Sequence, residues 1–369
     1  MTPEQFKAFS SFRNDFKKKI SEWSKFNDDL ISLQKMAAAK GSKSGAADYK
    51  IETPVCYNTT LDEVTEEDDI KLIVIGDNPG KNEQLEKNRR YLVGLAGKLG
   101  EKFFAENPEL GTDFRKNVII LNKTPVHSAR TEHLHYIIKN GRPEIAELIQ
   151  ESQVWMAEAT ARLHMALCQS AAAESQSVST ASQGTTQHKP YLSQVPLPQL
   201  WLVGYAELKG KGLFLSYRDT LLETYRNAGK QDLFTDTVFT FQHFSMNRFT
   251  IDLNDFRKKQ GGTDPQSKQG GTAPYSKQGG TDPYSKQKGT DPLSKQKGTD
   301  PLSKQGGTDP LSKQGGTDPL SKQGGTAPYS KQKGTDPQSK QGGTDPYFSD
   351  LSRDLKTLGS LHRKDIFGV

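Results

Sequence analysis

The sequence predicts an α/β protein, a three-layer α/β/α sandwich with a short, mostly parallel sheet, and three observations support this fold class. Four short apolar runs, rich in β-branched and aromatic residues, have the composition of buried strands. Segments with the hydrophobic spacing of helices separate most of these runs. The runs end in glycine or lead into polar residues. Strands that alternate with helices form a mostly parallel sheet covered on both faces.

The composition predicts one folded domain. Hydrophobic residues make up 33% of the 369 residues, and the shortfall is concentrated in two low-complexity stretches. Without them roughly 250 residues remain, enough for one domain with a substantial core. The expected segments are an N-terminal helix and loop (1–48), an α/β domain (49–257) with an insertion at 169–199, a tandem repeat (258–348), and a C-terminal helix that completes the domain (349–369).

The net charge of +6 comes from the repeat segment, because residues 258–347 contain fourteen Lys and eight Asp. The rest of the chain is formally neutral, so net charge does not support nucleic-acid binding by the folded part, although a local basic patch stays open. Cys56 and Cys168 belong to no Cys-x-x-Cys pattern, so we expect no disulfide framework, zinc site or iron-sulfur cluster. The sequence shows no apolar leader and no run of 18 apolar residues, which predicts a cytoplasmic protein without a membrane span.

The N-terminal segment has the pattern of a helix start. Thr2 is a suitable N-cap, Pro3 suits the first helical position, and Gln5 stands where a capping box places it. Apolar residues then follow at helical spacing, and three lysines occupy the opposite face. This pattern predicts a packing helix with a solvated face, followed by a loop at residues 37–48.

The central strand is predicted at residues 72–76, and it ends in the sequence Gly76-Asp77-Asn78-Pro79-Gly80. Asp77 and Asn78 therefore lie just past the carboxyl end of a buried strand. In open α/β sheets this is where ligands bind. Both residues also favour turns for backbone reasons, so a purely structural role is the alternative.

The next segment is predicted to contain a helix that starts in residues 91–100 and continues to about residue 105. Its small residues Gly94, Ala96 and Gly97 permit close approach, either of a neighbouring element or of a ligand. A second buried strand at 117–122 ends in Asn122. This residue occupies on the second strand the position that Asn78 has after the first.

The remaining strands follow a long predicted helix at 144–168. Residues 169–199 lack periodicity and are predicted to be a disordered insertion. A third strand is expected at 200–204, then a helix at 216–227 and a fourth strand at 237–241. The fourth strand leads directly into His243, Ser245, Asn247 and Arg248.

A nine-residue repeat, Lys-Gln-Gly-Gly-Thr-Asp-Pro-x-Ser, recurs ten times from Lys259 onward. Each copy offers at most one apolar or aromatic side chain, too few to offset the chain entropy of an ordered solenoid. We therefore expect a disordered tether inserted into the domain, which can also bind unknown protein partners. Beyond it, Ser349 or Asp350 can cap a helix whose leucines are spaced for one apolar face.

Three strand ends thus carry carboxylate, amide and imidazole groups: Asp77 with Asn78, Asn122, and His243. Residues 76–80 with Glu83, followed by Tyr91-Leu92-Val93-Gly94-Leu95-Ala96-Gly97-Lys98, resemble the first motif of the bacterial iron-sulfur branch of the uracil-DNA glycosylase superfamily. A His after the last strand is similar to that superfamily's second motif. The resemblance covers about residues 50–257 and 348–369. The cluster cysteines of that branch are absent, so no cluster and no other cofactor is implied.

The resemblance implies a uracil-DNA glycosylase-like fold and a role for each matching residue. Asn78 would orient the attacking water, with Asp77 as a base or electrostatic partner, and His243 would donate a hydrogen bond to the departing base. Asn122 would read the base edge. Gly76, Pro79 and Gly80 belong to the same base-binding motif. Either Leu92, which aligns with the stacking aromatic residue of the family, or the adjacent Tyr91 would contact the base.

The function implied is excision of uracil or a related damaged base from DNA by a monomer, with Ser245, Asn247 and Arg248 on the DNA backbone. His243 is followed by Phe-Ser-Met instead of the family's Pro-Ser-Pro. Three alternatives remain open from the residues themselves. His243 and Asn122 can be structural, the fold can serve a non-catalytic nucleic-acid or nucleotide-binding protein, and the repeat can be the functional part. His127, His133 and His135 lack paired acidic ligands, so no metal site is predicted.

Overall fold

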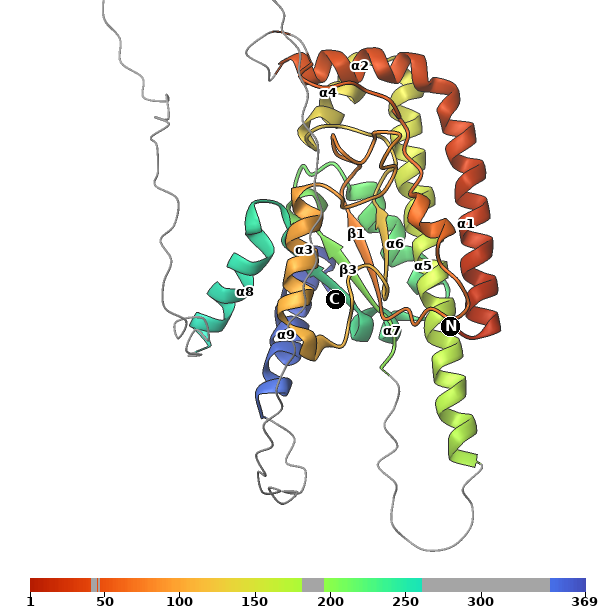
Figure 1. The fold of residues 1–369 in the computed structure, drawn as a ribbon, viewed down its shortest axis with the longest axis vertical. Helices are drawn as coiled ribbons and strands as arrows, with labels where there is room; N and C mark the ends of the chain where they lie inside the picture. Colours follow the sequence, from red (N-terminus) through yellow and green to blue (C-terminus); the bar gives the residue numbers. More distant parts are fainter. Residues whose placement is uncertain (41–44, 46, 181–195, 261–345) are drawn as a thin grey trace, which may run out of the picture. The chain divides into compact units, whose positions relative to one another are not determined.

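The computed structural model describes residues 1–40, 45, 47–180, 196–260 and 346–369, which belong to one compact unit (Figure 1). Its centre is a four-stranded sheet in the order β2-β1-β3-β4, with all neighbours parallel. The parallel α/β prediction is therefore confirmed, and all four predicted strands form. They are β1 (Leu72–Gly76), β2 (Val118–Asn122), β3 (Gln199–Val203) and β4 (Val238–Phe241).

Side chains alternate between the two faces of the sheet and build a core on each. In β1, Ile73 and Ile75 join one cluster, whereas Leu72 and Val74 join the other. Helices cover both faces, as in an α/β/α sandwich. The first face carries α1 (Pro3–Trp23), α2 (Asn27–Lys40), α4 (Glu132–Asn140), α5 (Pro143–Thr180), α6 (Leu215–Asn227) and α7 (Gln231–Thr237), and the second carries α3 (Leu95–Glu106), α8 (Arg248–Lys259) and most of α9 (Pro346–Phe367).

The predicted N-terminal capping box is present. The Gln5 N–H donates to Thr2 Oγ1 over 3.2 Å, and the Thr2 N–H donates to Gln5 Oε1 over 2.8 Å. The loop predicted from residue 37 is wrong for its first four residues, because α2 continues to Lys40. Ala37 and Ala38 are buried, so the helix continues for as long as it has a face to pack.

Helix α3 begins at Leu95, four residues later than the predicted start of that segment. Leu92 has a φ of 51°, which places it in the left-handed region and stops the helix from extending backward. The small residue at position 97 serves this turn, since a Cβ on Gly97 would lie only 1.4 Å from the Leu92 carbonyl oxygen. The sequence left two explanations for the small residues, close approach of a neighbouring element or of a ligand. At Gly97 the structure shows close approach of a neighbouring backbone.

The two low-complexity stretches are partly helical at their edges. Helix α5 extends to Thr180, so the first twelve residues of the predicted insertion at 169–199 are helix, and residues 181–195 lie outside the described residues. The sequence patterns do not predict helix α8, which ends at Lys259, where the repeat begins. Helix α9 begins at Pro346 instead of Ser349 or Asp350, consistent with the preference of proline for the first helical turn. Of the tether predicted at 258–348, residues 261–345 lie outside the described part of the chain, and its first two and last three residues belong to α8 and α9.

Helix α9 covers the exposed edge of β4. The His362 Nδ1–H donates to the Thr240 carbonyl over 3.2 Å, and Arg363 Nη1 donates to the Val238 carbonyl over 2.9 Å. These carbonyls alternate with that of Phe241, which accepts the Gly204 N–H on the β3 side. Side chains of α9 therefore bind carbonyl groups of β4 that would otherwise be open to pairing with another strand. None of the described helices is long and apolar enough to cross a bilayer.

Candidate functional site

The candidate site lies at the carboxyl edge of the sheet, where the chain crosses from β1 to β2 on one side and returns to β3 on the other. This change of direction is the topological switch point at which α/β sheets bind ligands. Asp77 follows β1 directly, and Gly204 follows β3. Gly204 has a φ of +87°, and a Cβ there would lie 2.5 Å from Asp77 Oδ1, so glycine lets the two strand ends approach.

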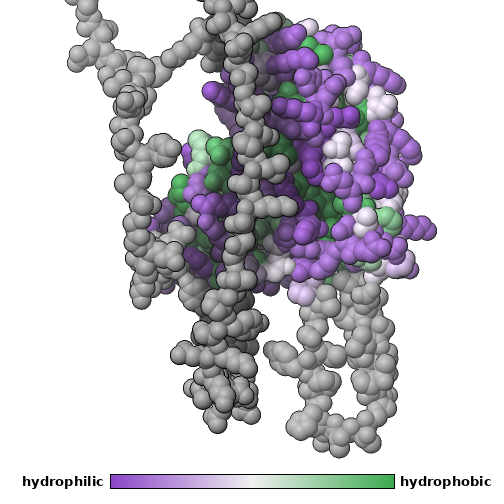
Figure 2. All heavy atoms as spheres, in the orientation of Figure 1, coloured by the Kyte–Doolittle hydropathy of each residue, from purple (hydrophilic) through white to green (hydrophobic). Residues whose placement is uncertain are grey.

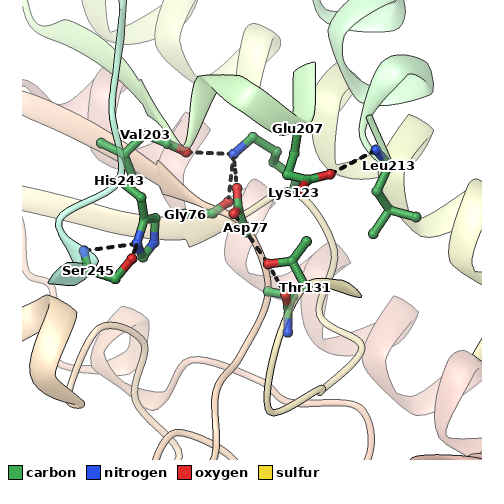
Figure 3. A network of polar contacts seen from close by, with 10 residues as sticks. Gly76, Asp77, Lys123, Thr131, Val203, Glu207, Leu213, His243 and Ser245 are labelled. Atoms are coloured by element: carbon green, nitrogen blue, oxygen red, sulfur yellow. Dashed lines mark hydrogen bonds and ion pairs between the residues drawn. The ribbon is translucent and has the colours of Figure 1, made fainter. Parts of the chain in front are cut away.

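Lys123, the first residue after β2, is the centre of the site (Figure 3). Its side chain is fully buried, and its Nζ lies 2.6 Å from Asp77 Oδ1. The same Nζ donates to the Val203 carbonyl over 2.7 Å and lies 3.4 Å from the Gly76 carbonyl. Three oxygens match the three donors of an ammonium group. Lys123 thereby joins the ends of β1, β2 and β3.

Sequence reasoning missed Lys123, because lysine after a strand is normally solvated. The signal that was available is its place directly after Asn122, at the same strand end as a predicted site residue.

Asp77 is anchored through one carboxylate oxygen. Lys123 holds Oδ1, whereas Oδ2 lies 3.4 Å from the Thr131 hydroxyl. The side chain keeps 14% of its surface exposed. Because the lysine does not engage Oδ2, this oxygen is the one placed to accept a hydrogen bond from a ligand or a water.

Asn78 joins two loops. Its Nδ2 donates to the carbonyl and the hydroxyl of Ser128, each over 3.0 Å, and so connects the turn after β1 to the loop after β2. Its Oδ1 lies 3.4 Å from the Thr131 hydroxyl. The amide hydrogens of Asn78 are therefore engaged within the protein, and only the Oδ1 side remains for the predicted water-orienting role.

His243 presents an imidazole beside the Asp77–Lys123 pair (Figure 3). The Ser245 N–H donates to its Nδ1 over 3.1 Å, and the Ser245 hydroxyl lies 2.8 Å from the same atom. Burial lowers the pKa of His243 from its usual 6.5, an effect that the Asp77 charge opposes and the Lys123 charge reinforces. The ring is therefore neutral at pH 7, and since Nδ1 accepts, Nε2 carries the proton.

Asn122 is the last residue of β2 and is only 2% exposed. It lies against Gly76 on β1, where a Cβ would come within 2.4 Å of Asn122 Oδ1. Its Nδ2 has no hydrogen-bond partner among the described residues. A buried, unpaired amide is unfavourable, and a role at a site is one of the reasons for which native structures retain such a group.

The other predicted base-binding residues present no side chain to this group. Tyr91 and Leu92 are 1% and 3% exposed and belong to the core, where the Tyr91 hydroxyl donates to the Cys56 carbonyl over 2.6 Å. Neither side chain presents a surface on which a base can stack. Pro79 and Gly80 shape the turn, because the Pro79 carbonyl accepts the Ser128 N–H and the Gly80 N–H donates to Glu83.

The predicted DNA-backbone residues follow β4 on the surface. Asn247 and Arg248 are exposed, and Ser245 is half-buried against His243. Met246 and Asn247 both have φ near 55°, a left-handed conformation that costs energy for residues other than glycine. Arg89 and Leu92 are the other non-glycine residues with positive φ in the described chain, so all four lie in loops at the carboxyl edge of the sheet.

No family model, curated protein or solved structure matches this chain. The chemistry of the site therefore rests on its own geometry. An anchored carboxylate, a neutral imidazole and an unpaired amide are arranged around a buried lysine at a switch point. This set can position a water, donate a hydrogen bond to a developing anion and bind a polar heterocycle.

Proposed function

We propose that this protein hydrolyses the N-glycosidic bond of a damaged base in DNA, with uracil as the first substrate to test, on a uracil-DNA glycosylase-like fold. The observation that carries the proposal is the buried Asn122 Nδ2 without a partner among the described residues, at the same sheet edge as Asp77 and His243. A base edge with hydrogen-bonding groups would complete that amide. Reaching it requires the nucleotide to be flipped out of a duplex.

The proposed roles follow from the charges that develop in the reaction. When water replaces the base at the sugar carbon, positive charge develops on the sugar and negative charge on the departing base. His243 donates through Nε2–H to the base oxygen, because its Nδ1 accepts from Ser245. Asp77 Oδ2 accepts from the water or faces the sugar charge, while Lys123 holds Oδ1. Asn122 binds the edge of the base.

The surroundings of the site support a polyanionic substrate. The four loops at this edge, residues 77–94, 123–131, 204–214 and 242–248, contain nine Lys or Arg and four Asp or Glu. The net charge of the folded part as a whole is formally zero, so it does not show this local excess of positive charge. Basic side chains around a site attract phosphates without specifying sequence.

Two exposed apolar residues stand beside this edge. Leu95 is 69% exposed at the start of α3, and Met246 is 68% exposed after His243. In the view of Figure 2, hydrophobic side chains gather on the side of the molecule where α8 lies, and the rest of the surface is mainly hydrophilic. Apolar side chains of this kind can enter a duplex and unstack a base step. We propose Met246 for this role, because it is exposed and lies only three positions after His243.

The test uses the purified full-length protein and uracil-containing single-stranded and duplex oligonucleotides, with abasic sites scored by alkaline cleavage. We expect cleavage by the wild-type protein and a loss of about two orders of magnitude or more in His243→Ala and Asn122→Ala. His135→Ala and Asn140→Ala, both exposed on α4, are matched controls that should retain full activity. No cleavage of uracil, hypoxanthine or mismatched substrates by folded protein would reject the proposal.

A second candidate function is non-catalytic binding of nucleic acid or a nucleotide on the same fold. It is favoured by one observation: the Asn78 Nδ2 donates to two oxygens of Ser128 and to the Pro79 carbonyl, so its amide hydrogens are not free to orient a water. Binding of uracil-containing oligonucleotides without release of free base, unaffected by Asn78→Ala, would select this function.

A further inference from the structure

The segment between β1 and α3, residues 77–94, contains no helix or strand, and we call it the β1–α3 loop. It begins with Asp77 and Asn78, so its position controls part of the site. Glu83 lies inside it, only 7% exposed, and its carboxylate accepts the Gly80 N–H over 3.1 Å. The backbone N–H groups of Leu92 and Val93, at the other end of the loop, also favour the charged form of this carboxylate. One buried carboxyl group therefore lies between the two ends of the loop.

The surroundings of Glu83 offer little compensation for a negative charge. Cys56 and Tyr91 face it as buried neutral groups, and Arg89 lies beside Cys56. The guanidinium of Arg115 is the cation that acts on Glu83. Burial outweighs the backbone hydrogen bonds and Arg115, and it raises the pKa of Glu83 to about 7.

The closed form of the loop is also strained. Arg89 and Leu92 have φ values of 41° and 51°, which side chains other than glycine rarely adopt. The Leu92 carbonyl is held by Arg115 Nη2 over 2.8 Å. A strained segment without regular structure is the kind of region that opens locally at low cost.

Access to the site requires a segment to move. Asn122 is 2% exposed and the Lys123 side chain is fully buried, so a ligand cannot reach either in the closed form. The β1–α3 loop is the neighbour best placed to move, because it starts at Asp77 and its Pro79 carbonyl and Asn78 amide contact Ser128 across the site.

We propose that the β1–α3 loop is a gate to the carboxyl edge of the sheet, and that loss of the Glu83 proton opens it. The sign follows from linkage: a carboxyl group that is harder to ionise inside the fold favours, once ionised, any state in which it reaches water. Opening therefore increases as pH rises from about 4.5, the ordinary pKa of a glutamate, to about 7, by up to tenfold per pH unit, and it levels off above pH 7. That the gate admits a DNA base rests on the proposed function, whereas the opening itself does not.

Hydrogen exchange of the full-length protein between pH 5 and 8.5, read by mass spectrometry and corrected for the intrinsic rate, tests the gate. Peptides covering residues 77–94 should show an opening constant that rises about tenfold between pH 5.5 and 6.5 and levels off above pH 7, and peptides from α5 should show no such rise. In Glu83→Gln the pH dependence of the loop should disappear, because glutamine keeps the shape without titrating. Glu86→Gln, an exposed residue of the same loop, should behave like the wild type.

A flat wild-type profile, or an unchanged slope in Glu83→Gln, would overturn the gate. If Glu83→Gln does not fold, a ¹³C titration of the Glu83 carboxyl in the wild type is compared with the exchange profile of the loop: the profile must level off at the pH at which the carboxyl titrates. The gate and the glycosylase proposal fail separately. Opening that depends on pH without base release keeps the gate alone, and base release with a flat exchange profile keeps the enzyme alone.

Discussion

Replacing Lys123 with methionine tests whether the buried ion pair organises the site. The substitution keeps a similar length but leaves the Asp77 carboxylate and the Val203 carbonyl without their donor. Removing one partner of a buried ion pair costs about 3–5 kcal/mol. We therefore expect Lys123→Met to lower the unfolding free energy by about 4 kcal/mol, and Asp77→Asn to cost a similar amount because it leaves the ammonium uncompensated.

The double variant Lys123→Met/Asp77→Asn removes both charges, so it should cost only about 1–2 kcal/mol, chiefly for the carbonyl left unpaired. Urea unfolding followed by far-ultraviolet circular dichroism measures all three free energies. Lys209→Met is the control, because Lys209 forms an ion pair of 2.7 Å with Asp365 on the exposed surface and should cost less than about 1 kcal/mol. Additive costs in the double variant would refute the reasoning, since they would mean that the two charges do not interact.

Three further predictions concern the fold. Arg363→Met should cost about 2–3 kcal/mol in chemical unfolding, because it removes a charged donor from the Val238 carbonyl of β4, whereas the exposed Arg353→Met should stay within about 0.5 kcal/mol. Gly97→Ala should cost at least about 3 kcal/mol or prevent folding, since its Cβ meets a backbone carbonyl, while Gly94→Ala has open space; equal melting temperatures would contradict this. Burial lowers the pKa of His164 to about 4, so the folded state loses about 1.4 kcal/mol per pH unit as pH falls from 6.5 to 4, and His164→Gln should flatten that part of the melting profile.

Some of the site residues were predicted from the strand pattern, and others only from the family resemblance. The sequence placed Asp77, Asn122 and His243 at one edge because each ends a strand or follows one within two residues, and parallel strands bring their carboxyl ends to one edge. Base stacking by Tyr91 or Leu92 came from the family resemblance alone. In this structure the turn before α3 directs both side chains into the core.

What the sequence by itself determined is therefore local: the four strands, the capping box at Thr2 and the polar groups at the strand ends. These features depend on residue spacing and on contacts within a few positions. Only the tertiary structure decided that Lys123 is buried, that the Asn78 amide is engaged by Ser128, and that α9 covers β4. Burial and hydrogen-bond partners depend on segments that lie 46 or more positions apart in the chain, and no local pattern records them.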